Sequence, residues 1–186
     1  YIVEKEGRIY KINDLKNIKK ELYLDFSHKV MSKGESGFLG LAFHPNFIKN
    51  KTFFVFYTAF EQNKSFQTLS KIIDHGSKGL KEEILISQFD EAANHNGGDL
   101  HFGQDGYLYV SLGDEGGAND FYQNSQKIDK DFFSGILRID IDLKKDNLWP
   151  KPHPSISLDP NGSSRYKIPH NNPWVQAQDF SGKPIN

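Results

Sequence analysis

Residues Asn94–Asp114 have the sequence NHNGGDLHFGQDGYLYVSLGD, which holds the clearest strand and turn signals of the chain. Two alternating segments, Asp99–Gly103 and Tyr107–Leu112, flank the turn sequence Gln104-Asp105-Gly106. Alternation of polar and apolar residues is the period of a strand that buries one face. Such strands on either side of a short turn form a hairpin. We therefore predict a β-hairpin over Asp99–Leu112.

An internal repeat extends this pattern along the chain. Gly7–Ile12 resembles Gly106–Ser111, and Thr52–Tyr57 has a similar apolar build between them. The equivalent positions, 45 and 54 residues apart, are Tyr10, Val55 and Tyr109. Periods of about 40–50 residues with several short strands are typical of propeller blades. At that period the chain makes about four blades; the alternative is chance similarity between strands of a sandwich.

The other segments also favour strands over helices. Lys51–Thr58 is β-branched and aromatic, and Gly135–Asp142 alternates. The best helical candidate is Asp14–Leu24, although Asn17–Lys20 within it could equally be a charged loop. Leu143–Asn186 holds seven of the eight prolines, so we expect a long surface excursion there and no central strand or long helix.

The composition excludes several classes of protein. Lys and Arg total 23 against 24 Asp and Glu, a net charge of -1, which argues against a nucleic-acid partner held by bulk positive charge. The absence of cysteine excludes a disulfide scaffold, a thiolate metal site and a cysteine nucleophile. The longest apolar runs, Gly37–Phe43 and Phe53–Tyr57, fall far short of the ~20 residues that span a bilayer.

Two glycine-rich loops carry candidate functional residues. His95 stands just before Gly97-Gly98, at the end of a loop that leads into a strand. A histidine held there suits a general base, because its ordinary pKa lies near neutral. The alternative is a turn histidine that bonds to backbone. Gly113–Asp120 is rich in carboxylates and amides, which can bind Ca²⁺, but an ordinary solvated acidic turn is the simpler interpretation.

Three further features have simpler structural explanations. His95, Asp99 and His101 could supply metal ligands, but their spacing matches no standard zinc pattern, and we predict no metal site there. Glu35 either lines a pocket or is a solvated loop carboxylate. His44 is expected to be structural, because the proline after it fixes a bend.

Four motifs, taken together and in order, resemble the soluble, pyrroloquinoline-quinone (PQQ)-dependent glucose/sorbosone dehydrogenases. They are Gly34–Phe47 (GESGFLGLAFHPNF), Asn94–Asp114, Ser134–Asp142 (SGILRIDID) and Tyr166–Trp174 (YKIPHNNPW). The resemblance implies an all-β, six-bladed β-propeller. Residues 1–186 are then expected to be the N-terminal portion of a single propeller domain, roughly its first half. We expect a piece of a longer protein, neither active nor stable alone.

The resemblance also implies an activity. PQQ and Ca²⁺ would lie at one mouth of the propeller, and His95 falls at the position of the family's general base. The expected reaction is oxidation of the anomeric carbon of an aldose to the lactone, with hydride passing to the quinone and an external electron acceptor completing the cycle. Most Ca²⁺ ligands and the Arg and Lys residues that clamp the cofactor are expected outside this chain.

Three more positions follow from the resemblance. Glu35 stands where the glucose enzymes carry a Gln that contacts cofactor and sugar. Asn94 stands where they carry an Asp beside the base, and Asn119 falls near a substrate-contacting amide. The first two differences change hydrogen bonding and charge, which argues against glucose itself as substrate. The family implies a secreted or periplasmic enzyme. The alternative is a non-catalytic binding propeller related to Hedgehog-interacting-protein-like proteins, whose branch Asn96-Gly97-Gly98 also resembles.

Overall fold

Antiparallel strands make up nearly all the regular structure of the chain. The computed structural model describes residues 1–125, 127, 131–175 and 177. Its strands are β1 (Ile2–Glu4), β2 (Arg8–Ile12), β3 (Lys20–Asp25), β4 (Phe38–Phe43), β5 (Thr52–Glu61), β6 (Lys64–Asp74), β7 (Leu80–Asp90), β8 (Gly97–Phe102), β9 (Leu108–Leu112) and β10 (Gly135–Ile139). One-turn helices, α1 (Phe47–Asn50) and η1 (Gly76–Lys78), lie between strands. Neither is long enough to cross a membrane.

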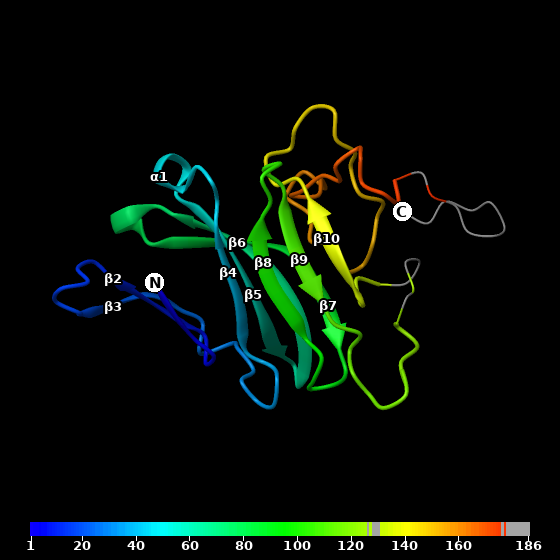
Figure 1. Ribbon diagram of the computed structural model, residues 1–186, viewed down its shortest axis with the longest axis horizontal. Helices are drawn as coiled ribbons and strands as arrows, with labels where there is room; N and C mark the ends of the chain where they lie inside the picture. Colours follow the sequence, from blue (N-terminus) through cyan, green and yellow to red (C-terminus); the bar gives the residue numbers. More distant parts are fainter. Residues whose placement is uncertain (126, 128–130, 176, 178–186) are drawn as a thin grey trace.

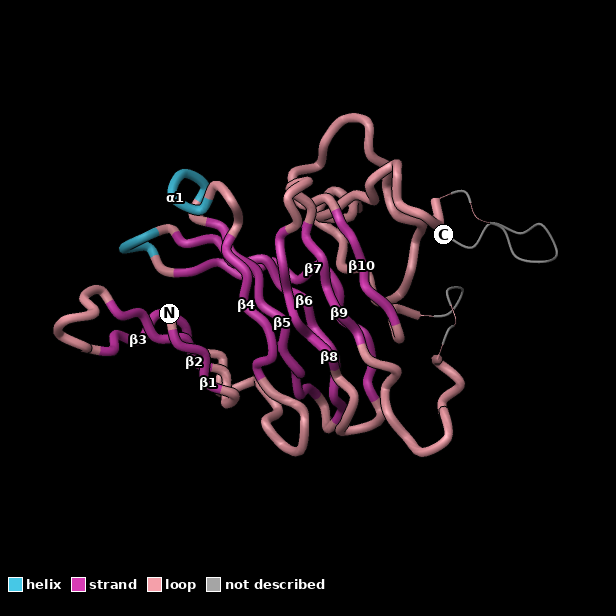
Figure 2. Tube along the Cα trace, in the orientation of Figure 1, coloured by secondary structure: helices cyan, strands magenta, loops and turns pink. Residues whose placement is uncertain are grey.

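The strands form three sheets in the part of the chain that the structure describes. Each sheet joins successive strands in chain order: β1-β2-β3, β4-β5-β6-β7 and β8-β9-β10. The second sheet lies between the other two, as blades of a propeller do (Figures 1 and 2). The repeated segments around Tyr10, Val55 and Tyr109 are each the second strand of a sheet, which confirms the repeat. Chain length predicts about four blades, and the described residues after Ile139 add no further strand.

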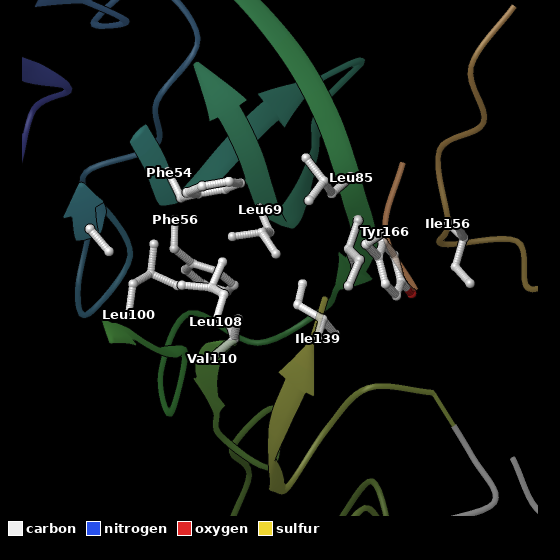
Figure 3. Packing of buried hydrophobic residues seen from close by; sticks show 12 residues of the cluster. Phe54, Phe56, Leu69, Leu85, Leu100, Leu108, Val110, Ile139, Ile156 and Tyr166 are labelled. Atoms are coloured by element: carbon white, nitrogen blue, oxygen red, sulfur yellow. The ribbon is translucent and has the colours of Figure 1, made fainter. Parts of the chain in front are cut away.

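Strand β5 belongs to two cores at once because its side chains alternate between the faces of the sheet. Phe53, Val55 and Tyr57 pack with residues of the first sheet. Phe54 and Phe56 pack on the other side with Leu100, Leu108, Val110 and Ile139 of the third sheet (Figure 3). All five β5 side chains are buried, and each such Phe contributes about 2–3 kcal/mol of hydrophobic free energy. The sheets are therefore joined through apolar layers.

The predicted hairpin over Asp99–Leu112 is confirmed as β8 and β9, with Leu100 opposite Val110 and Phe102 opposite Leu108. Where the second and third sheets meet, backbone packs on backbone. A Cβ on Gly40 would lie 2.1 Å from the carbonyl oxygen of Gly98. No side chain fits in that space, so a larger residue at Gly40 would force the two sheets apart.

The helical prediction for Asp14–Leu24 is wrong. The segment is a loop followed by β3, whose residues Lys20–Asp25 pair with β2. Leu24 is buried in the core between the first two sheets. The charged-loop alternative describes the first half correctly. Cross-strand pairing, a tertiary effect, outweighs the weak local helical preference here.

The proline-rich stretch from Leu143 contributes to the core as well as to the surface. Its described residues form isolated bridges in place of strands, among them Ile156 with Ile86 and Lys167 with Asp140. Ile156 and Tyr166 lie in the core beside the third sheet (Figure 3). Residues 176 and 178–186 of the stretch lie outside the described part. Proline prevents continuous strands here, yet single apolar side chains still reach the core.

Candidate functional site: a histidine–aspartate pair

The hairpin register brings two functional groups together. Gly97 at the start of β8 pairs with Leu112 at the end of β9. His95 precedes Gly97 by two residues and Asp114 follows Leu112 by two, so both lie at the same end of the hairpin. His95 Nδ1 lies 2.7 Å from Asp114 Oδ1. An antiparallel ladder therefore joins residues from two loops.

The His95–Asp114 bond fixes which nitrogen of the ring carries the proton. An ionised carboxylate only accepts hydrogen bonds, so Nδ1 is the donor and a neutral ring leaves Nε2 as an acceptor. Hydrogen bonds from His95 and from the Gly116 N–H hold the pKa of Asp114 below its usual range. The His95 side chain is 50% exposed and that of Asp114 28% exposed. The ring can thus meet a ligand while its partner holds the tautomer.

Backbone geometry at the site depends on a glycine. A Cβ on Gly113 would lie 1.6 Å from the carbonyl oxygen of His95, a distance no side chain allows. His95 itself has φ 56°, in the left-handed region that non-glycine residues rarely adopt. Such strain persists only where surrounding contacts determine it, and it is enriched at functional sites.

Glu35 lies in the turn before β4 and contacts the loop that carries His95. Its Oε2 accepts the backbone N–H of His95 at 2.6 Å, and its own N–H donates to the carbonyl of Ala93 at 3.2 Å. Glu35 is exposed but engaged with protein. The Glu35 carboxylate therefore lies beside the backbone of His95 and helps hold its strained conformation.

The other two expected contact residues lie at different distances from the pair. Asn94 packs against the loop that follows Asp114: a Cβ on Gly116 would lie 2.3 Å from Asn94 Oδ1. Asn94 therefore lies next to the loop that carries Asp114. Asn119 is exposed at φ 60° in the turn beyond it, and the structure gives its side chain no bond to His95 or Asp114.

Asp114 is the residue of the histidine–aspartate pair that the sequence analysis does not single out. It was included in the loop Gly113–Asp120, for which a solvated turn was the simpler interpretation. The regular hairpin register, with Leu100 opposite Val110, extends to Glu115 opposite His95; a register shift between Gly97 and Leu100 brings Asp114 to the ring instead, and no local pattern predicts that shift.

The remaining candidates lie elsewhere or act structurally. Within the described ranges, no three histidine, aspartate or glutamate side chains lie close enough to share a metal ion, so His95, Asp99 and His101 do not converge. His44 is buried, and both of its ring nitrogens bond within the protein, to Asn46, Asn50 and Asp142. The structural interpretation of His44 is therefore confirmed.

Successive antiparallel sheets, each built from neighbouring strands in chain order, define the class of the β-propellers. The sequence fits one family of that class: the model of the Glucose / Sorbosone dehydrogenase family matches residues 1–179. The chain belongs to this family.

Relatives of two kinds resemble the chain. Human Hedgehog-interacting protein is 32% identical over 164 residues, covering 80% of this chain and 23% of that protein. Quinoprotein glucose dehydrogenase B of Acinetobacter calcoaceticus is 26% identical over 181 residues, covering 81% and 35%. The chain therefore spans about a quarter to a third of the length of these relatives.

Solved structures agree on the fold. The PQQ-bound aldose sugar dehydrogenase of Streptomyces coelicolor superposes with a TM-score of 0.57 at 19% identity, covering 97% of this chain and 60% of that one. A glucose dehydrogenase gives a TM-score of 0.64 at 20% identity, covering 98% and 46%. The chain thus has the propeller-type β fold of these structures and covers part of each.

Proposed function

We propose that this chain carries the proton-accepting side of a PQQ-dependent aldose dehydrogenase. The observation that carries the proposal is the His95–Asp114 bond, which leaves Nε2 of a half-exposed ring as an acceptor. His95 Nε2 takes the proton of the anomeric hydroxyl while the hydride leaves C1, and the product is the lactone. Asp114 stabilises the imidazolium that forms.

Bound PQQ supplies the quinone that accepts the hydride. The residues present fit the sugar side of this reaction. Glu35 and Asn94 lie beside the base, where they are proposed to hydrogen-bond to sugar or cofactor, and Asn119 is proposed as an outer contact. The arginines of the described residues bond elsewhere, Arg8 to Asp25, Arg138 to Asp105 and Arg165 to the Leu158 carbonyl. We therefore assign no cofactor clamp to them, and Ca²⁺ ligands are expected outside this chain.

The proposed setting follows from the family. We propose a secreted or periplasmic protein that passes electrons to an external acceptor. A pair of differences from the glucose enzymes, Glu35 for Gln and Asn94 for Asp, favours an aldose other than glucose. Both side chains lie at the site, so they can change which hydroxyl groups are recognised.

A second candidate function is a binding propeller without redox chemistry. The observation that favours it is the 32% identity to human Hedgehog-interacting protein, whose name describes a protein partner. On this proposal the His95–Asp114 pair is a structural remnant that fixes the hairpin end. The two candidates differ in whether the protein binds PQQ and turns over sugars.

The test is dye reduction by the full-length protein, reconstituted with PQQ and Ca²⁺, across a panel of aldoses. His101→Ala is the matched control for His95→Ala, because His101 is an exposed histidine of the same hairpin. We expect sugar-dependent reduction that falls about 10²–10⁴-fold in His95→Ala and stays unchanged in His101→Ala. A folded protein with neither turnover nor PQQ binding would exclude the dehydrogenase and leave the binding propeller.

A further inference from the structure

The end of β7, in the second sheet, is hydrogen-bonded to the loop that carries His95. Asp90 is the last residue of β7 and its side chain is 1% exposed. Its Oδ2 accepts a hydrogen bond from Asn96 Nδ2 at 2.6 Å. Asn96 directly follows His95 and is itself buried. The backbone of the base is therefore tied to a strand of the neighbouring sheet through one buried bond.

Glu91, the residue after Asp90, is hydrogen-bonded to the loop that carries Asp114. The backbone N–H of Glu91 donates to Glu115 Oε1 at 2.9 Å. Glu115 directly follows Asp114, and its Oε2 accepts Asn124 Nδ2 at 2.9 Å. The Asn124 amide also reaches the carbonyl of Asp114 at 3.2 Å. Two adjacent residues, Asp90 and Glu91, thus hold the residues that follow His95 and Asp114.

The loops need such contacts because their backbones are strained. His95 has φ 56° and Glu115 has φ 72°, and neither is a glycine. Conformations of this kind cost of order 1–3 kcal/mol each and persist only where other contacts determine them. The bonds at Asn96 and Glu115 are contacts of this kind, as is the bond from the His95 N–H to Glu35.

These contacts also require two carboxylates to be buried, which costs free energy when a carboxylate is charged. Asp90 and Glu115 are both buried, and neither takes part in an ion pair with the described lysines, arginines or histidines. Burial, with a smaller contribution from the nearby charge of Glu115, raises the pKa of Asp90 to about 6. A buried carboxylate without a cation costs free energy, and groups with such perturbed pKa values gather at functional sites.

We propose that Asp90, Asn96 and Glu115, which we call the β7 brace, are positioning residues that hold His95 and Asp114 at bonding distance. None of them needs to touch the substrate. The kinetic consequence of the brace rests on the proposed dehydrogenase function. The geometric consequence does not, because the His95–Asp114 bond can be measured without turnover.

The test compares three substitutions that change the hydrogen bonds to one buried oxygen, Asp90 Oδ2. Asp90→Leu removes the acceptor of the Asn96 amide. Gln67→Leu is the matched control, because the Gln67 amide donates to the same Asp90 Oδ2 at 3.3 Å but comes from β6 and has no link to the base loop. Asp90→Asn keeps an oxygen that can accept both amides, so it should restore the position without the charge.

The main readout is the pKa of the Asp114 carboxyl, followed by carbon-13 NMR in the full-length protein. We expect it to stay low in the wild type, Gln67→Leu and Asp90→Asn, and to rise towards the ordinary aspartate value in Asp90→Leu. The kcat for sugar oxidation should fall at least 10-fold in Asp90→Leu alone. If the protein oxidises no sugar, the carboxyl titration still decides the brace.

The proposal is overturned if Asp90→Leu and Gln67→Leu lower the unfolding temperature alike and the Asp114 titration is unchanged in both. If the pKa of Asp114 rises in Asp90→Asn as much as in Asp90→Leu, the proposal is also overturned. The charge of Asp90, and not its hydrogen bond to Asn96, would then hold the pair in place. Should Asp90→Leu fail to fold, Asn96→Ala removes the same bond from the other side. An unchanged Asp114 titration in that variant contradicts the brace.

Discussion

Two histidines of this protein each lie beside an aspartate, and their surroundings differ. His44 is 5% exposed, and its Nε2 donates to Asp142 Oδ1 at 3.2 Å. Its Nδ1 accepts the Asn46 N–H at 2.9 Å and contacts the Asn50 amide at 2.7 Å. Both nitrogens are therefore used, and His44 fixes the bend after β4.

Among the described residues, the ring of His95 bonds through one nitrogen only. Its Nδ1 bonds Asp114, its ring is half exposed, and its backbone lies in a strained conformation. The comparison teaches that a histidine beside an aspartate is not by itself a base. A base needs an acceptor nitrogen that no neighbour occupies and a path for a ligand to reach it.

The largest expected effect is on the aspartate of the exposed pair. In Asp114→Asn the amide can donate to Nδ1, which places the ring proton on Nε2, the wrong nitrogen for a base. We expect kcat/KM for sugar oxidation to fall about 10²–10⁴-fold, measured by dye reduction. The unfolding temperature should stay close to that of the wild type. A loss of less than threefold would show that the His95 tautomer is not set by Asp114.

The second effect concerns the buried histidine, His44. His44→Leu removes three hydrogen bonds, with the Asn46 N–H, the Asn50 amide and Asp142, and each lost bond costs about 0.5–1.5 kcal/mol. We expect the free energy of unfolding in urea to fall by about 2–4 kcal/mol, with kcat of the folded enzyme unchanged. A variant of wild-type stability with reduced kcat would reverse the roles of the two histidines.

These two predictions show what the sequence could and could not supply. The hairpin and the position of His95 follow from local alternation and turn residues. The bond from His95 to Glu35 joins residues 60 apart in the chain, and no local pattern encodes it. The hairpin register predicts the loop that meets His95 but not the residue, because a register shift between Gly97 and Leu100 brings Asp114 to the ring. The segment Asp14–Leu24 was misjudged because its strand forms only by pairing with β2.

The third effect is a pH dependence of stability that arises from Asp90. Burial raises the pKa of Asp90 from 3.8 to about 6, so the folded protein keeps a proton that the unfolded chain releases. Stability contributed by this group is present at pH 4 and is lost as the pH rises through 6. Asp90→Asn does not titrate. Its stability relative to wild type should rise by up to about 3 kcal/mol between pH 4 and 7.5.

Urea denaturation of both proteins at several pH values measures that difference. All other titrating groups are shared, so the comparison isolates Asp90. A constant difference across the range would show that the Asp90 carboxyl titrates alike in the folded and unfolded chains.

The smallest effect is expected at Glu35. Its contact with the base is an accepted hydrogen bond from the His95 N–H, and an amide oxygen can accept it equally. Glu35→Gln should therefore change kcat by less than about threefold while altering the order of preferred aldoses in KM. Glu35→Ala, which loses the acceptor, should lower kcat further. Equal kinetics in both variants would remove Glu35 from the site.

The central claim, that His95 accepts the sugar proton, is tested most directly in a single turnover. The full-length protein and His95→Ala are loaded with PQQ and Ca²⁺, mixed anaerobically with an aldose that the wild type oxidises, and followed by the quinone absorbance. We predict equal cofactor binding and bleaching at least about 10²-fold slower in His95→Ala. Equal bleaching rates in the two proteins would contradict the account.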